Sequence, residues 1–292
     1  MPATAAISPQ ITSEQARQYQ RDGAILIRNA LSAAELELLE AGLEESHENP
    51  GSRFTRVNGA NGRGETLVEL LPSLDCPSLR ALMATGTVAR LAGELMTAPS
   101  AQLVFDQVFY KQPGHILPTP WHQDTPFLRV RGHDMARVWL CCDPSPADLT
   151  VQVVRGSHLW NVIYGTNPGG TKTVAIANEG SDFTYDGMEV QSAPQVPDVA
   201  GQSDSFDILR WDVEPGDALV LNANVLHGAD GREHHPVPRR AFASIWGGPD
   251  VLNYAPPQHA VPSFAETMGH QVPHGARIGD YPQAYPIGWQ RA

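Results

Sequence analysis

Hydrophobic and polar positions follow a helical period near the N-terminus. Capping-box patterns, in which Ser or Thr is followed three residues later by Gln or Glu, begin at Thr12 and at Ser32. After the second pattern, Leu36, Leu39 and Leu43 share one side of a helix. We therefore predict two helices, the second of which packs on a core. Shorter elements are predicted at 24–27 (strand), 78–84 (helix) and 87–97 (helix).

The pattern changes after about residue 100, where short apolar runs with alternating polarity predict β-strands. In the longest run, 102–111, alternation places Phe105, Gln107, Phe109 and Lys111 on one face. Further strands are predicted at 135–142, 149–154, 206–213, 217–221 and 241–246.

Two irregular stretches interrupt these elements. Residues 48–66 are rich in Gly, Asn and Arg and predict a loop, either over an active site or at the plain surface. Residues 164–204 predict a lid or substrate-binding loop, because a loop of that length in a compact domain is usually functional or disordered.

Short strands with turn signals, preceded by helices, predict a mainly β fold with flanking helices and a double-stranded β-helix (jelly-roll, cupin-like) core. We interpret residues 1–292 as a single domain. Residues 1–100 would supply the N-terminal helices and first strand, and 101–248 the jelly-roll core with the lid loop 164–204. Residues 249–292 would form a C-terminal wrap that covers the barrel, closes its mouth or contributes to a homodimer.

The chain is acidic, with 20 Lys and Arg against 32 Asp and Glu and a net charge of −12. Nucleic acids and anionic membranes are bound by clusters of basic residues, so neither is an expected partner. The absence of a leader pattern and of a membrane-spanning apolar run predicts a cytoplasmic protein, with Cys76, Cys141 and Cys142 as reduced thiols. Gly-rich phosphate loops, Cys-x-x-Cys pairs and Gly-x-Ser-x-Gly motifs are absent, which disfavours kinase, zinc-ribbon and serine-hydrolase functions.

The clearest candidate chemistry lies in Trp121-His122-Gln123-Asp124. Residues two apart in a strand point to the same side, so His122 and Asp124 can converge on one metal ion. A His-x-Asp pattern alone occurs more often in solvated turns, so a third ligand is needed. His227 follows the predicted strand 217–221 and is the best candidate. The three residues would form a two-His, one-carboxylate facial triad, which leaves positions open on iron(II).

Two arginines follow the third candidate ligand. Arg239 and Arg240 open the predicted strand 241–246, and a buried arginine can hold a carboxylate through two parallel hydrogen bonds. Because neighbouring strand residues face opposite sides, only one of the two is expected to face the barrel interior.

These motifs resemble the phytanoyl-CoA dioxygenase family of iron(II)- and 2-oxoglutarate-dependent oxygenases. The resemblance covers most of the chain, and its segments keep the family's order. They are Ile11–Gln15, Arg21–Arg28, Tyr110–Gly114, Trp121–Asp124, Val138–Leu140, Val154–His158, Gly216-Asp217, His227-Gly228 and Pro238–Ala241.

The resemblance implies that His122, Asp124 and His227 bind iron(II). It also implies that Arg239, which directly follows Pro238, holds the distal carboxylate of 2-oxoglutarate, with Arg240 as the competing choice.

Three further residues are expected near the co-substrate. Trp139 matches a tryptophan of the family that lies there, and relatives carry polar residues near Gln107 and Lys111. Lys111 could equally be a solvated strand end. One departure is Ala229, because many relatives have a serine at this position that helps hold the co-substrate.

The activity implied by the resemblance is oxidation of an unactivated C–H bond in a small natural product or metabolic intermediate. Oxygen and 2-oxoglutarate would be consumed, and succinate and CO2 released. Related halogenases lack the carboxylate at the position of Asp124, so its presence favours hydroxylation, desaturation or ring closure over chlorination.

Two alternatives remain from the residues alone. A cupin-like isomerase or binding protein without oxygenase activity would keep the metal triad but would not need Arg239. A zinc hydrolase is disfavoured because no general-base carboxylate lies at a recognisable spacing from the triad.

Overall fold

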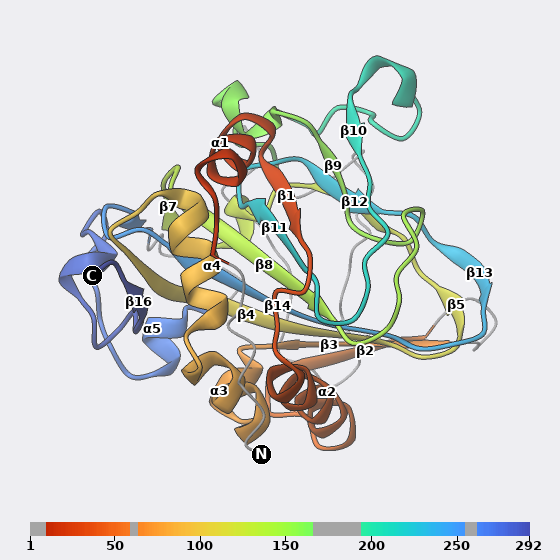
Figure 1. Cartoon of the computed structure of the whole chain (residues 1–292), viewed down its shortest axis with the longest axis horizontal. Coiled ribbons are helices and arrows are strands. Elements are labelled where there is room, and N and C mark those ends of the chain that lie inside the picture. The colour runs from red at the N-terminus through yellow and green to blue at the C-terminus, as the bar shows by residue number, and fades with distance from the viewer. Residues whose placement is uncertain (1–9, 59–63, 166–193, 255–261) are drawn as a thin grey trace.

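The computed structural model describes residues 10–58, 64–165, 194–254 and 262–292 (Figure 1). Two antiparallel sheets form its centre, and N-terminal helices cover one face of the larger sheet. No helix among the described residues is long and apolar enough to cross a membrane.

The N-terminal helices begin where the capping boxes predict. Thr12 caps α1 (Ser13–Asp22) and Ser32 caps α2 (Ala33–Glu48), and each cap makes both reciprocal hydrogen bonds of the box. The other elements of this region are β1 (Ala24–Ile27), β2 (Phe54–Asn58), β3 (Glu65–Leu70), η2 (Pro72–Leu74), α3 (Pro77–Ala84) and α4 (Thr87–Met96).

The larger sheet carries most of the core. Its central strands are β4 (Ser100–Lys111), β8 (Met135–Cys141), β11 (Ala218–Asn222) and β14 (Arg239–Gly247). The order is β1-β11-β8-β14-β4-β3-β2, and β16 (Ile287–Gln290) pairs with the beginning of β4. The main hydrophobic core lies between this sheet and the helices and includes Leu91 of α4, Val138 of β8 and Phe242 of β14.

The smaller sheet contains β10 (Ile208–Leu209), β9 (Gln152–Val154), β12 (His227–Ala229) and β6 (Thr119–His122), in that order. It packs against the face of the larger sheet that the helices leave free. A second hydrophobic cluster joins Val153 of β9 to Trp139, Leu219 and Ala241 of the larger sheet. Residues of this cluster therefore mark the barrel interior between the two sheets.

Short elements connect the sheets and complete the C-terminal part. They are β5 (Gly114–Ile116), η3 (Thr125–Phe127), β7 (Val130–Arg131), η4 (Ser157–Trp160), η7 (Ser203–Ser205), β13 (Arg232–His235), β15 (Leu252–Asn253), α5 (Phe264–Thr267) and η8 (Ile278–Asp280).

The loop predicted for 48–66 is wrong in part, because β2 and the beginning of β3 lie within it. The two strands pair with each other, and β3 also pairs with β4. A 2.5 Å ion pair between Arg56 and Glu65 ties the hairpin across its two strands. Strand propensity depends strongly on neighbouring strands. The local Gly and Asn content therefore favoured a loop prediction, although pairing with β4 stabilises an edge hairpin here.

Two predicted strands are shorter than expected. Only Gln152–Val154 of the run 149–154 and Ile208–Leu209 of the run 206–213 are strands. The backbone N–H groups of Leu149 and Thr150 instead donate to the carbonyl of Pro146 at 2.8 and 2.9 Å, which closes a turn. Most of the predicted lid loop, residues 166–193, lies outside the described residues.

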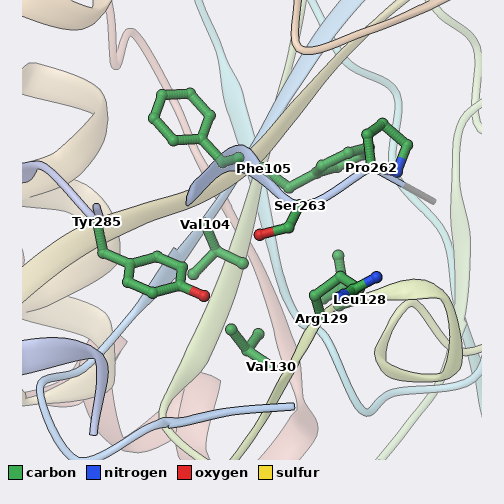
Figure 2. Close-up of a pocket in the computed structure, with 9 residues that line it drawn as sticks. Val104, Phe105, Leu128, Arg129, Val130, Pro262, Ser263 and Tyr285 are labelled. Atoms are coloured by element: carbon green, nitrogen blue, oxygen red, sulfur yellow. The ribbon is translucent and has the colours of Figure 1, made fainter. Parts of the chain in front are cut away.

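The C-terminal segment packs along the beginning of β4. The hydroxyl of Tyr285 donates a 2.6 Å hydrogen bond to Asn253. A cavity of about 10 Å³ lies here, and Figure 2 shows residues that line it, such as Val104 of β4, Ser263 and Tyr285. That volume holds about one water molecule, so this cavity is too small for an organic substrate.

Candidate metal centre

The structure brings His122, Asp124 and His227 together between the two sheets. His122 ends β6, His227 begins β12, and the two residues are direct partners in the antiparallel pair. Asp124 precedes η3 and its backbone N–H donates to the carbonyl of Ala223, which holds the carboxylate beside the imidazoles. One ligand atom from each side chain lies within 4.8 Å of the others.

The geometry of the two imidazoles suits metal binding. Nδ1 of His122 is 2.7 Å from the carbonyl of Pro120, and Nδ1 of His227 is 3.1 Å from the carbonyl of Val225. These contacts place the proton of each ring on Nδ1. The lone pair of Nε2 is then free to bind a metal. The two Nε2 atoms lie 3.9 and 3.7 Å from Oδ1 of Asp124.

Electrostatics keep the cluster in the protonation states that a metal needs. Burial lowers the pKa of His122, and burial together with the His122 charge lowers the pKa of His227 to about 3. Burial would raise the pKa of Asp124, but the Arg137 charge and the two histidines hold it below its usual value. Two neutral imidazoles and one carboxylate are the donor set of a facial triad.

One atom of the cluster has no protein partner. Oδ2 of Asp124 is buried and has no hydrogen bond among the described residues. A buried carboxylate oxygen without a partner is costly, and a bound cation relieves that cost. The residues present therefore fit an iron(II) ion.

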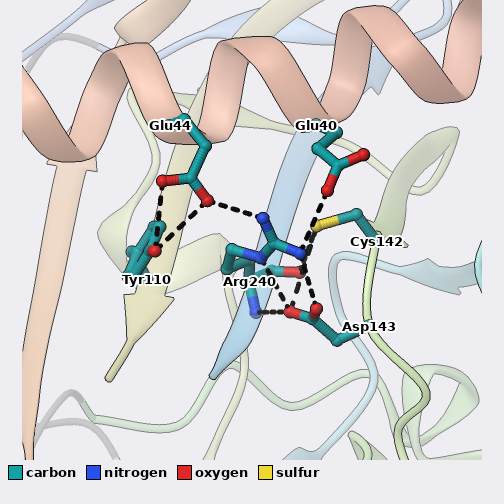
Figure 3. Close-up of polar contacts among 6 residues, drawn as sticks. All are labelled: Glu40, Glu44, Tyr110, Cys142, Asp143 and Arg240. Carbon is teal, nitrogen blue, oxygen red and sulfur yellow. Dashed lines mark hydrogen bonds and ion pairs between the residues drawn. The ribbon is translucent and has the colours of Figure 1, made fainter. Parts of the chain in front are cut away.

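The two adjacent arginines of β14 point to opposite faces of the larger sheet. Arg240 faces α2 and pairs with Asp143 at 2.7 Å, Glu44 at 2.5 Å and Glu40 at 3.4 Å (Figure 3). Its side chain is thus occupied by three carboxylates on the outer face. These contacts tie the sheet to α2 and leave Arg240 unsuited to a ligand in the barrel.

Arg239 lies on the interior face, which it shares with Ala241 of the second hydrophobic cluster. It is 5% exposed, and its guanidinium donates to the carbonyl of Leu149. Burial lowers its pKa to about 10. No carboxylate pairs with it among the described residues, so no acidic side chain there neutralises its charge.

Lys111 of β4 lies directly opposite Arg239 in the sheet. It is buried, and its Nζ donates to the carbonyl of Leu117 at 3.0 Å. The expected alternative of a solvated strand end is therefore wrong. Gln107 and Trp139 are both register partners of Ala243, so they share the interior face with Lys111 and Arg239.

Sequence reasoning missed Arg137. This residue of β8 donates a 2.6 Å hydrogen bond from a terminal guanidinium nitrogen to Oδ1 of Asp124, and both side chains are buried. The available signal was its spacing, because Arg137 precedes Trp139 by two and must share its face.

A model of the family described as phytanoyl-CoA dioxygenase (PhyH) matches residues 19–241. The chain belongs to the phytanoyl-CoA dioxygenase family. A comparison with curated proteins gives no match.

Solved structures of similar fold include iron- and 2-oxoglutarate-dependent enzymes. The carbocyclase SnoK from nogalamycin biosynthesis has a TM-score of 0.67 and 18% identity, covering 95% of this chain and 96% of its own. The epimerase SnoN, in complex with Fe3+, α-ketoglutarate and nogalamycin RO, has a TM-score of 0.64 and 17% identity, with 94% and 98% covered. EctD from S. alaskensis with 2-oxoglutarate and 5-hydroxyectoine has a TM-score of 0.62 and 16% identity, with 88% and 86% covered. The predicted jelly-roll fold class and the predicted family are both confirmed.

Proposed function

We propose that this member of the phytanoyl-CoA dioxygenase family is an iron(II)- and 2-oxoglutarate-dependent oxygenase. It oxidises an unactivated C–H bond of a small organic molecule. When the reaction is a hydroxylation, the substrate, O2 and 2-oxoglutarate are converted into an alcohol, succinate and CO2. The observation that supports this most directly is the His122, Asp124 and His227 cluster inside a jelly-roll barrel.

In this proposal the three residues of the cluster hold iron(II), which supplies the capacity to activate O2 once 2-oxoglutarate and substrate are bound. The backbone carbonyls of Pro120 and Val225 hold the two imidazole rings by their Nδ1–H groups. Their Nε2 atoms therefore stay available for the metal throughout a catalytic cycle.

Arg239 distinguishes the oxygenase from a cupin-like metal protein without oxygenase activity. A site that binds only a metal does not need a buried arginine without a carboxylate partner. We assign it to the distal carboxylate of 2-oxoglutarate. Lys111 adds a second cation at the same end, and Trp139 and Gln107 line the interval between this end and the metal.

The substrate is assigned only by class. The similar structures include a carbocyclase, an epimerase and an enzyme bound to 5-hydroxyectoine, so this fold hosts several oxidative outcomes on small molecules. We favour hydroxylation, with desaturation and ring closure as further outcomes. The predicted cytoplasmic location and homodimer stay predictions.

The decisive experiment is an anaerobic titration of the metal-free protein with iron(II) and then with 2-oxoglutarate. A metal-to-ligand charge-transfer band in the visible spectrum is expected for the wild type. His122→Ala should abolish the band, and Arg239→Ala should need more 2-oxoglutarate to reach it. If iron binds but no band forms, the oxygenase assignment fails and the cupin-like metal protein becomes the better description.

A further inference from the structure

Arg137 lies at the metal end of the barrel interior. Its guanidinium contacts Oδ1 of Asp124 at 2.6 Å, the same oxygen that lies 3.7 Å from Nε2 of His227. Its other terminal nitrogen is 3.4 Å from Oε1 of Gln107, a long contact. The guanidinium carbon lies 5.5 Å from the centre of the Phe109 ring. These contacts hold the charge directly beside the position that a metal would take.

Most donors of this guanidinium remain unused. An arginine has five N–H donors in a planar fork, and the two contacts above are its hydrogen bonds among the described residues. The remaining N–H groups have no acceptor among the described residues, so they can donate to a ligand bound beside Asp124.

The position of Arg137 complements that of Arg239. Both residues belong to the interior face, at opposite ends of the row that contains Ala241 and Ala243. The register partner of Arg137 on β14 is Ile245, six residues beyond Arg239. The two alanines between them carry only methyl groups, so neither side chain would block a ligand that reaches from one arginine toward the other.

We propose that Arg137 holds the Asp124 carboxylate in place and binds the carboxylate of 2-oxoglutarate that is bonded to the keto carbon. This inference rests on the proposed function and assigns a role to a second arginine at the same site. A co-substrate carboxylate held beside Asp124 would come within reach of the unused donors of Arg137, because that guanidinium lies 2.6 Å from Oδ1 of Asp124. The distal carboxylate is left to Arg239.

The alternative is a purely structural role, in which Arg137 only neutralises buried Asp124. A structural role predicts that loss of the arginine weakens metal binding and affects all co-substrates only through the metal. The proposed role predicts a direct loss of co-substrate affinity in protein that is already loaded with metal. The two roles are separated by choosing a ligand that lacks the distal carboxylate.

The test uses full-length protein saturated with iron(II) under anaerobic conditions, and the charge-transfer band as the readout of affinity. Two ligands are titrated, 2-oxoglutarate and 2-oxopentanoate, which keeps the keto acid but lacks the distal carboxylate. The variants are Arg137→Gln, Arg137→Lys and Arg239→Gln. Arg17→Met, which removes an exposed arginine on α1, is the control for net charge.

Arg137→Gln should weaken both ligands by about 10- to 100-fold, the loss expected for one charge-assisted hydrogen bond. Arg239→Gln should weaken 2-oxoglutarate by a similar factor and leave 2-oxopentanoate nearly unchanged. Arg137→Lys keeps the charge and should lie between the wild type and Arg137→Gln. Arg17→Met should change neither affinity.

Three results would overturn the inference. The first is unchanged affinity of both ligands in Arg137→Gln. The second is a loss confined to 2-oxoglutarate, and the third is loss of iron binding itself in both Arg137 variants. If Arg137→Gln does not fold, Arg137→Lys decides by the same criteria. A wild type that binds iron without any band would instead refute the proposed function, so the two failures are distinguishable.

Discussion

Arg239 and Lys111 face each other across the β14–β4 pair, and both are buried at the same end of the barrel interior. Each donates to a backbone carbonyl, that of Leu149 for Arg239 and that of Leu117 for Lys111. Burial and the nearby Arg239 charge lower the pKa of Lys111 well below its usual value. Neither side chain has a carboxylate partner among the described residues, so an anion that binds between them would stabilise the charged forms of both.

Binding of 2-oxoglutarate should therefore be coupled to proton uptake at Lys111. The bound carboxylate raises the lowered pKa, so the lysine takes up a proton at any pH between its pKa in the free protein and its higher pKa in the complex. Affinity should fall as pH rises through that range. Calorimetry of 2-oxoglutarate binding in buffers of different ionisation enthalpy measures the protons taken up.

Lys111→Met tests the assignment of this proton. The variant should bind 2-oxoglutarate about 10- to 100-fold more weakly and take up no proton, because it has lost a charge-assisted contact. Arg240→Lys, on the opposite face, is the matched control and should keep wild-type uptake. Proton uptake that persists in Lys111→Met would assign it to another group.

Gly228 should control the distance between the two metal-binding strands. A Cβ at this position would lie 3.1 Å from the carbonyl oxygen of Thr119 and 3.1 Å from the Trp121 ring, both in β6. Gly228→Ala is therefore expected to push β12 from β6 and move His227 away from His122. Iron(II) affinity, measured with a competing chelator, should fall about 10- to 100-fold, the range known for residues that support metal ligands. The control is Ala229→Ser, on the same strand as Gly228. Gly86→Ala would not be an equivalent control, because Gly86 has a φ of +78°, where any other residue is strained.

An unchanged metal affinity in Gly228→Ala would show that β6 and β12 can separate without moving the ligands. Ala229→Ser adds only a hydroxyl group on the same strand, and it should bind iron(II) as the wild type does.

Asp106 should make the stability of the fold depend on pH. Neither of its buried carboxylate oxygens has a hydrogen-bond partner in the described part of the chain. Burial raises its pKa to about 7, although nearby Ser73 opposes the shift. Between pH about 4 and about 7 the folded chain keeps a proton that the unfolded chain has released, so the free energy of unfolding falls as pH rises.

Asp106→Asn removes this titration and stays neutral at every pH. The stability of the variant relative to the wild type should rise by about 3 kcal/mol between pH 5 and pH 8, because about two pH units of the titration range lie between these values. Urea unfolding of both proteins at the two pH values gives the comparison. A constant difference between them would mean that Asp106 does not titrate in this range.

Ser32 should contribute to the stability of α2 through its cap. Its hydroxyl accepts from the N–H of Glu35 at 3.3 Å, and the Glu35 carboxylate accepts from the N–H of Ser32 at 2.8 Å. Ser32→Ala should lower the free energy of unfolding by about 1 kcal/mol. Ser32→Thr keeps the hydroxyl and should lower the free energy of unfolding much less. Thermal unfolding of both variants measures the difference. Equal losses in the two variants would show that the cap does not account for the effect.

Local backbone geometry explains why part of the site could be read from the sequence. A strand repeats every two residues, so Arg239 and Arg240 had to face opposite sides, and Gln107 and Lys111 the same side. Capping boxes require only neighbouring residues, and both helices begin where those patterns predict. The family could also be predicted from the sequence, because its motifs keep a fixed order along the chain.

Contacts between distant strands were decided by the tertiary structure. The pairing of Arg137 with Asp124 joins β8 to the segment after β6, and no local period relates the two. The edge hairpin β2–β3 likewise depends on pairing with β4. Register between strands follows from how the whole core packs, so the sequence determined which face each side chain takes, and the fold decided which side chains meet across the barrel.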